Sequence, residues 1–95
     1  MTSKELLSII NNGETSKVQF KRQINSVDSI AAEMIAFSNS KGGVILIGVE
    51  DKTGQVIGLS NEQLPEYNQL IAKIANNNIK SSIFLFTGIV ELVFG

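Results

Sequence analysis

The sequence predicts a single small α/β domain in the order α-β-α-β-β-α-β-β, and three observations carry that prediction. The chain has 95 residues, of which 43% are hydrophobic, and this suits one domain with one modest core. Residues 27–38 place apolar side chains at the spacing of one helical face. Residues 44–49 form a nearly continuous apolar run, which is typical of a strand that is covered on both faces and is therefore central.

The first 25 residues predict a short helix followed by a half-exposed strand. Thr2 and Glu5 have the spacing of a capping box, and Gly13 ends the helix because glycine accepts the left-handed conformation. Val18 and Phe20 then alternate with polar residues, which indicates a strand with one face in the core. The opposite face of this strand is expected to carry Lys17, Gln19 and Lys21.

The second half of the chain predicts further turns, strands and one helix. These elements are a turn at 51–54, a return strand at 55–59, a helix from about Pro65 to 76–78, and a closing hairpin of 83–86 and 89–94. The inward face of the helix at 27–38 is expected to consist of Val27, Ile30, Ala31, Met34 and Ile35. The side chains expected in the core are Val18, Phe20, Ile30, Met34, Ile45, Ile47, Leu70 and Ile74.

Composition excludes several classes of chemistry. The chain has no cysteine and no histidine, so disulfides, thiol catalysis, a serine–histidine triad and the usual zinc ligand sets are absent. The formal net charge of -1 excludes a strongly basic protein of the histone kind but allows a local basic patch. No apolar run reaches the roughly 18 residues that cross a bilayer, and the N-terminus lacks a signal core. We therefore expect a soluble cytoplasmic protein with no membrane partner.

Residues 36–51 join the end of a helix, a glycine turn and the central strand. Together with Glu14, the segment Gln19-Phe20-Lys21 and the segment Val56-Ile57-Gly58, they resemble the Schlafen-type Alba-like domain, a family also described as divergent AAA. The resemblance covers most of residues 1–95. It implies binding of DNA or RNA, and in bacteria it implies the N-terminal domain of a transcriptional regulator.

The nucleic-acid site that the resemblance implies surrounds the glycine turn. The residues expected to contact phosphates there are Lys17, Lys21, Arg22, Asn39, Lys41, Gly42 and Gly43. The alternative is that the glycines only turn the chain and that the basic residues form an ordinary solvated surface. Ser38–Gly43 lacks the spacing of a phosphate-binding loop and follows the negative end of a helix dipole, so ATP binding is disfavoured and no cofactor is expected.

Acidic residues raise the separate question of catalysis. In animal Schlafen relatives the domain is a metal-dependent ribonuclease whose acids occupy the positions matched here by Glu14, Gln19 and Asp51. Gln19 is neutral where the family usually has an acid, and two carboxylates hold a divalent cation poorly. Glu14 and Asp51 therefore stay the only catalytic candidates, and we predict no efficient nuclease activity and no bound metal. The alternative is that Glu14 is a surface carboxylate and that Glu50 and Asp51 open a β-turn.

Apolar residues near the C-terminus support a second interpretation. The runs at 83–86 and 89–94 end at Gly95 without a polar tail, and an unpaired apolar strand invites association. This predicts a domain that is cut short at its C-terminus or covered by a partner. A protein-interaction or homodimerisation module is therefore the alternative to nucleic-acid binding.

Overall fold

The computed structural model describes residues 2–75, 79–84 and 88–94, and within these ranges it contains three helices and one four-stranded mixed sheet. The helices are α1 (Ser3–Asn12), α2 (Val27–Ser38) and α3 (Gln63–Ile74). The strands are β1 (Val18–Lys21), β2 (Gly43–Ile47), β3 (Ile79–Phe84) and β4 (Ile89–Phe94). The predicted α/β class is confirmed.

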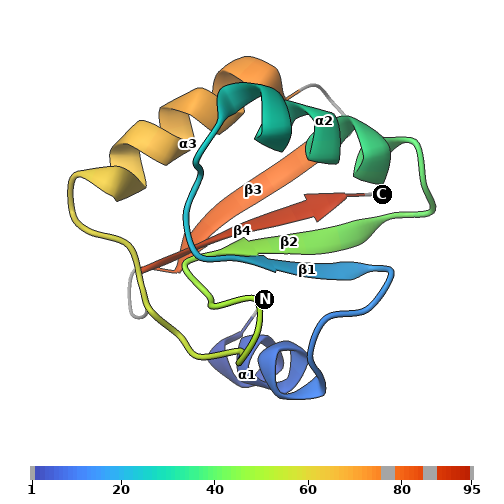
Figure 1. Ribbon diagram of the computed structural model, residues 1–95, viewed down its shortest axis with the longest axis vertical. Helices are drawn as coiled ribbons and strands as arrows, with labels where there is room; N and C mark the ends of the chain where they lie inside the picture. The colour runs from blue at the N-terminus through green and yellow to red at the C-terminus, as the bar shows by residue number, and fades with distance from the viewer. Residues whose placement is uncertain (1, 76–78, 85–87, 95) are drawn as a thin grey trace.

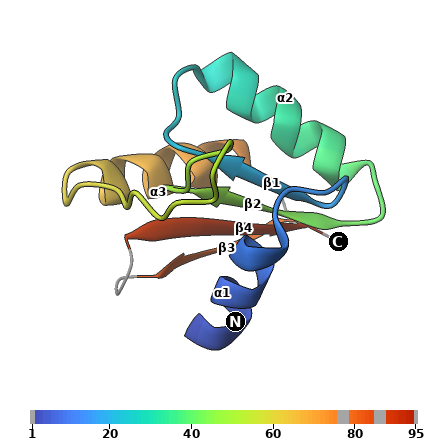
Figure 2. The same ribbon diagram turned by 60° about the horizontal axis from the view of Figure 1, so that its bottom comes forward.

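The sheet separates two layers of helix. Its strand order is β1-β2-β4-β3, with β1 parallel to β2 and the other two pairs antiparallel. Helices α2 and α3 cover one face and α1 covers the other, as Figures 1 and 2 show from two directions. The predicted central position of β2 is confirmed, because this strand pairs with β1 on one side and with β4 on the other.

Alternating strand side chains divide the apolar core into two clusters on opposite faces of the sheet. Ile45 and Ile47 pack under α2 and α3, whereas Phe20 and Leu46 pack against α1. Five of the eight predicted core residues are buried, namely Phe20, Ile30, Met34, Ile45 and Ile47. The other three are only half-buried, namely Val18, Leu70 and Ile74. Val18 begins an edge strand, Leu70 lies about 100° around α3 from the buried Ile71, and Ile74 is the last residue of that helix.

The first helix begins and ends as its sequence predicts. The Thr2 side chain accepts a hydrogen bond of 3.1 Å from the backbone N–H of Glu5, which satisfies a donor that the helix itself leaves unpaired. Gly13 follows the last turn with a φ of 80°, and its N–H donates to the carbonyl oxygen of Ile10. Local chemistry is therefore sufficient to place α1.

The outer side of α2 corrects one prediction. Ile30 and Met34 are buried, but Val27 and Ile35 are 52% and 59% exposed. Successive helical residues are about 100° apart, so Ile35 lies about 140° around the helix from Ile30. The buried stripe is narrower than predicted and runs through Ile30, Met34 and Phe37.

The predicted return strand at 55–59 is wrong. In the described ranges this segment makes one isolated bridge, between Val49 and Val56. The N–H groups of Ile57 and Gly58 both donate to the carbonyl oxygen of Gly48 at 2.9 Å, so the segment curls over the end of β2 and does not run beside it.

Two further boundaries differ from the sequence prediction. Helix α3 begins at Gln63, two residues before Pro65, because Ser60 and Gln63 exchange hydrogen bonds that order its start. The first strand of the closing hairpin begins at Ile79 and not at 83. The predicted end of the third helix, at 76–78, lies outside the described residues. Among the described helices, none has the length and apolar content needed to span a membrane.

Candidate nucleic-acid interface

The structure divides the seven predicted contact residues between opposite ends of the β1–β2 pair. At the end where both strands begin, the N–H of Val44 donates to the carbonyl oxygen of Lys17 at 2.8 Å. At the other end, the N–H of Gly48 donates to the carbonyl oxygen of Lys21 at 2.6 Å. Four residues of strand separate these ends by about 13 Å. We call the first group the glycine-turn end (Lys17, Asn39, Lys41, Gly42, Gly43) and the second the acidic end (Lys21, Arg22, Glu33, Glu50, Asp51).

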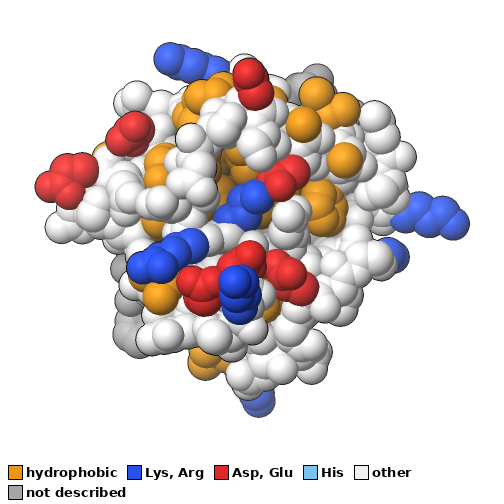
Figure 3. Space-filling model, viewed as in Figure 1, with side chains coloured by type: hydrophobic (Ala, Val, Ile, Leu, Met, Phe, Trp, Pro, Cys, Tyr) orange, Lys and Arg blue, Asp and Glu red, His pale blue; other side chains and the backbone are white. Residues whose placement is uncertain are grey.

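Both predicted cations of the acidic end have carboxylate partners. The Lys21 ammonium lies 2.8 Å from Oε1 of Glu33, and the Arg22 guanidinium lies 3.7 Å from Oε2 of Glu50. Figure 3 shows acidic and basic side chains mixed over the middle of this face. A phosphate group that binds here must therefore compete with a carboxylate at each cation.

Glu33 is a site residue that sequence reasoning missed. It projects from α2 toward β1, where its Oε1 also accepts a hydrogen bond of 3.3 Å from the amide of Gln19. Its Oε2 is buried and has no hydrogen-bond partner among the described residues. The available signal was that Glu33 is the single charged residue beyond the first turn of an otherwise apolar helix. Gln19 and Lys21 share one strand face, as predicted, and both reach Glu33.

Glu50 and Asp51 open a turn, as one of the two interpretations from sequence predicted. The N–H of Gly54 donates to the carbonyl oxygen of Glu50 at 2.9 Å, and the N–H of Lys52 donates to the Glu50 side chain at 3.4 Å. The Asp51 side chain is exposed, and its hydrogen bond with the Glu50 side chain lowers the pKa of Asp51 below the ordinary value of 3.8. Both carboxylates therefore form hydrogen bonds within the turn.

Glu14 is held by the backbone of the edge strand. Its Oε1 accepts a hydrogen bond of 2.8 Å from the N–H of Phe20, a donor that faces away from β2. Glu14, Gln19 and Asp51 thus have three different partners. Across residues 2–75, 79–84 and 88–94, no group of three acidic side chains is placed to hold a metal ion.

The glycine pair is explained by close packing. A Cβ on Gly43 would overlap the Phe37 ring, with Cδ1 at 2.5 Å, and would lie 2.9 Å from the carbonyl oxygen of Lys17. The Phe37 ring in turn stacks on Phe94, with ring centroids 5.3 Å apart. Gly42 is itself buried. The backbone of Gly42 and Gly43 is therefore covered by other parts of this chain.

Lys17, Asn39 and Lys41 are the exposed residues of the glycine-turn end. In the described part of the chain, neither lysine forms an ion pair with a carboxylate. Figure 3 shows basic side chains projecting at the right of the molecule, where the segments before β1 and β2 lie, without acidic side chains beside them on this face. This end is therefore the more positive of the two.

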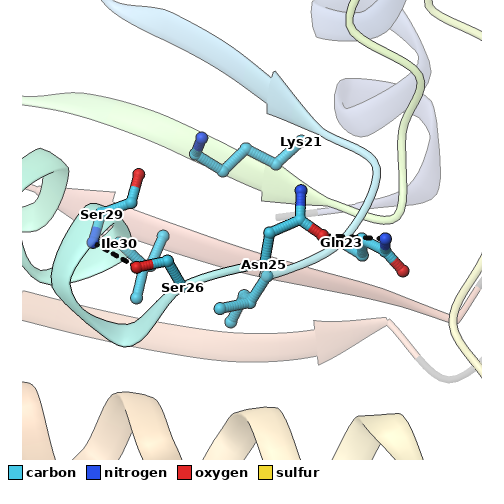
Figure 4. Close-up of a pocket in the computed structure, with 7 residues that line it drawn as sticks. Lys21, Gln23, Asn25, Ser26, Ser29 and Ile30 are labelled. Carbon is cyan, nitrogen blue, oxygen red and sulfur yellow. Dashed lines mark hydrogen bonds between the residues drawn. The ribbon is translucent and has the colours of Figure 1, made fainter.

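Two small pockets flank Lys21 at the acidic end. One, of about 110 Å³, lies between the end of β1 and the first turn of α2, and Figure 4 shows the Lys21 side chain extending toward that turn. The other, of about 160 Å³, includes Arg22 and Asp51 in its wall. Sites for drug-sized ligands occupy about 300–1,000 Å³, so both pockets are too small to enclose a nucleotide.

Comparisons with known proteins agree with the resemblance found in the sequence. The family model described as Schlafen, AlbA_2 matches residues 14–93, which include both ends of the candidate interface. A protein of Ureaplasma parvum serovar 3, described as an uncharacterized ATP-binding protein, is 32% identical over 74 residues. That match covers 76% of this chain and 21% of the relative, so the chain spans about a fifth of the relative's length. Because the family model covers most of its length, this chain belongs to the Schlafen, AlbA_2 family.

Proposed function

We propose that this chain is the nucleic-acid-binding module of a bacterial transcriptional regulator and that its glycine-turn end contacts the phosphates. One observation carries the choice of this end: Lys17 and Lys41 are exposed without a carboxylate partner in the described ranges, whereas Lys21 and Arg22 are paired. A surface ion pair is worth up to about 1 kcal/mol after solvent screening, so an existing carboxylate lowers the affinity of its cation for an incoming phosphate.

The contact is made by side chains and not by the backbone of the glycine pair. Gly42 is buried, and the N–H of Val44 is already bonded to Lys17. The turn also follows the C-terminal end of α2, where the helix dipole is negative and repels a phosphate that approaches the backbone. The long side chains of Lys17 and Lys41 place their charges away from the negative end of α2, and the side-chain amide of Asn39 adds a neutral hydrogen-bond donor.

ATP binding is stated in the name of the relative, and we do not extend it to this chain. The two small pockets are too small for a nucleotide, and about four-fifths of the relative lies outside the matched segment. An ATP site in that relative is therefore fully compatible with a nucleic-acid site in the segment shared with this chain.

A salt titration tests the proposal directly. Each phosphate that a lysine neutralises releases counterions, so two lysines give a log–log slope of affinity against salt of about -1.8 for duplex DNA and about -1.4 for single strands. Fluorescence anisotropy with labelled duplex DNA, single-stranded DNA and RNA at low salt measures both affinity and slope. It also decides which nucleic acid is preferred.

Matched variants locate the contact. We expect Lys17→Ala and Lys41→Ala each to weaken binding and to reduce the size of the slope by about 0.9 on duplex DNA. Lys73→Ala, on the exposed side of α3, makes the same change of net charge elsewhere and should have little effect. Equal losses in all three variants, or no binding at low salt, would refute the proposal.

A further inference from the structure

The hydrogen-bonding direction of each strand can be followed across the sheet from the β1–β2 pair. The N–H groups of Val44 and Gly48 donate to carbonyl oxygens of β1, so even-numbered residues of β2 point toward β1. In a strand, successive backbone groups point to opposite sides. Odd-numbered residues of β2 therefore point toward β4, and the pair Ile45 and Leu92 is a hydrogen-bonded pair.

The same alternation identifies which groups of β3 face outward. The backbone N–H and C=O groups of even-numbered β4 residues form hydrogen bonds with β2, so those of Glu91 and its odd-numbered neighbours point toward β3. Glu91 pairs with Ser82, which leaves the odd-numbered residues of β3 pointing away from the sheet. These residues are Ile79, Ser81 and Ile83. Within the described ranges, their outward N–H and C=O groups have no backbone partner.

The opposite edge of the sheet is closed by the chain itself. On β1, the N–H of Phe20 donates to Glu14, and Val18 and Thr15 exchange two backbone hydrogen bonds. Strand β3 has no comparable cover from the described residues, and it is the longer edge strand, with six residues against four. An open edge is a template for another strand, and a sheet with one closed edge forms a closed pair and not a filament.

We propose that the outer edge of β3 binds the same edge of a second copy of this chain, antiparallel and about a two-fold axis at Ser81. An axis perpendicular to the sheet keeps the helices of both copies on corresponding faces and pairs outward residues only with outward residues. Centred on Ser81, it pairs Ile79 with Ile83 of the second copy, and Ser81 with itself. Three such pairs exchange about six backbone hydrogen bonds.

The side chains of β3 fit this register. Ile79 and Ile83 lie on the face that packs against the core cluster under α2 and α3, so each meets an apolar side chain across the axis. Lys80 lies opposite Ser82 of the second copy and not opposite another lysine, so like charges do not face each other. A centre at Lys80 would bring two lysines together. It would also pair only Ile79 with Ser81 within β3, so fewer backbone hydrogen bonds would be exchanged.

The full chain tests this in two ways. Sedimentation equilibrium over a wide range of concentration should show reversible formation of a dimer and no larger species. Because the chain has no cysteine, a Ser81→Cys variant should form an intermolecular disulfide in mild oxidant, and a Thr53→Cys variant, exposed in a turn far along the chain, should not. A monomer at every concentration, or equal cross-linking of the two variants, would overturn the proposal.

Charge at the axis provides the sharpest test. Ser81 is exposed, so Ser81→Lys and Ser81→Glu should fold, as circular dichroism can verify, and each should raise the dimer dissociation constant at least about tenfold through repulsion across the axis. An equimolar mixture of the two should form a heterodimer. Ser81→Pro, which removes an outward N–H without touching the β3–β4 ladder, should also abolish dimers. Dimers that persist in all three separate variants would exclude this edge, whatever the outcome of nucleic-acid titrations.

Discussion

Replacing Gly43 with alanine tests the packing role of the glycine turn. The added Cβ would overlap the Phe37 ring and approach the carbonyl oxygen of Lys17 at 2.9 Å. The φ of Gly43 is +153°, a value that residues with side chains rarely adopt. The ring is also held by its stacking on Phe94, the residue that pairs with Gly43 between β2 and β4. Gly43→Ala should therefore destabilise the fold.

The expected loss follows from two contributions. Inserting a methyl group into a packed region costs about 1–3 kcal/mol, and backbone strain adds about 1 kcal/mol or more. We expect the free energy of unfolding to fall by about 3 kcal/mol. For a domain of this size that corresponds to a decrease in Tm of about 12–24 °C. Gly13→Ala, where open space surrounds the new Cβ, should cost only the backbone contribution of about 1 kcal/mol.

Urea unfolding of four chains checks the physical reason. In a cycle of wild type, Gly43→Ala, Phe37→Ala and the double variant, removing the ring should relieve the clash. The double variant should be more stable than additivity predicts by at least about 1 kcal/mol. A Gly43→Ala chain within about 0.5 kcal/mol of wild type, or strictly additive losses, would refute the packing explanation.

Four other predictions follow from single contacts. Glu14→Ala leaves a backbone N–H of the edge strand unpaired and should cost about 1–2 kcal/mol in urea unfolding, whereas Glu14→Gln keeps an acceptor and should cost less. Glu33→Gln frees Lys21, so it should raise affinity for duplex DNA and increase the size of the salt slope by up to about 0.9; unchanged binding would contradict this. In Mg²⁺ or Mn²⁺ the purified chain should leave labelled RNA intact, and cleavage that disappears in Glu14→Ala or Asp51→Ala would show the opposite. The hydrogen bond with Glu50 lowers the pKa of Asp51 in the folded chain, so ionised Asp51 stabilises the fold at pH values above its pKa in the unfolded chain. This stabilisation is lost as the pH falls through the pKa of Asp51 in the folded chain, and an NMR titration of Asp51 should give a midpoint below 3.8.

Local patterns in the sequence were sufficient for most elements of the fold. The bounds of α2, the cap of α1 at Thr2 and the central place of β2 all follow from residues adjacent in the chain. The wrong return strand at 55–59 had an equally good local pattern. It ends after one bridge, between Val49 and Val56, because the N–H groups of Ile57 and Gly58 share the carbonyl oxygen of Gly48 and the N–H of Leu59 donates to the carbonyl oxygen of Gly88, a contact made by the tertiary fold.

The candidate site shows a sharper division. The sequence gives the positions of the basic residues along the chain. It does not show that Lys17 and Lys21 lie at opposite ends of the parallel β1–β2 pair. Nor does it show that Glu33 on α2 lies across from Lys21, or that the Phe37 ring covers Gly43.

The sequence by itself therefore determined the three helices and four strands in their order, with one strand predicted in excess at 55–59, and the absence of cysteine and histidine chemistry. Only the tertiary structure decided which cations are neutralised, which edge of the sheet stays open and why Gly43 must lack a side chain. The physical reason is one of range. Backbone preference and apolar spacing act between neighbours along the chain. Ion pairs, ring packing and strand edges depend on which distant segments the sheet brings together, and no local pattern specifies that arrangement.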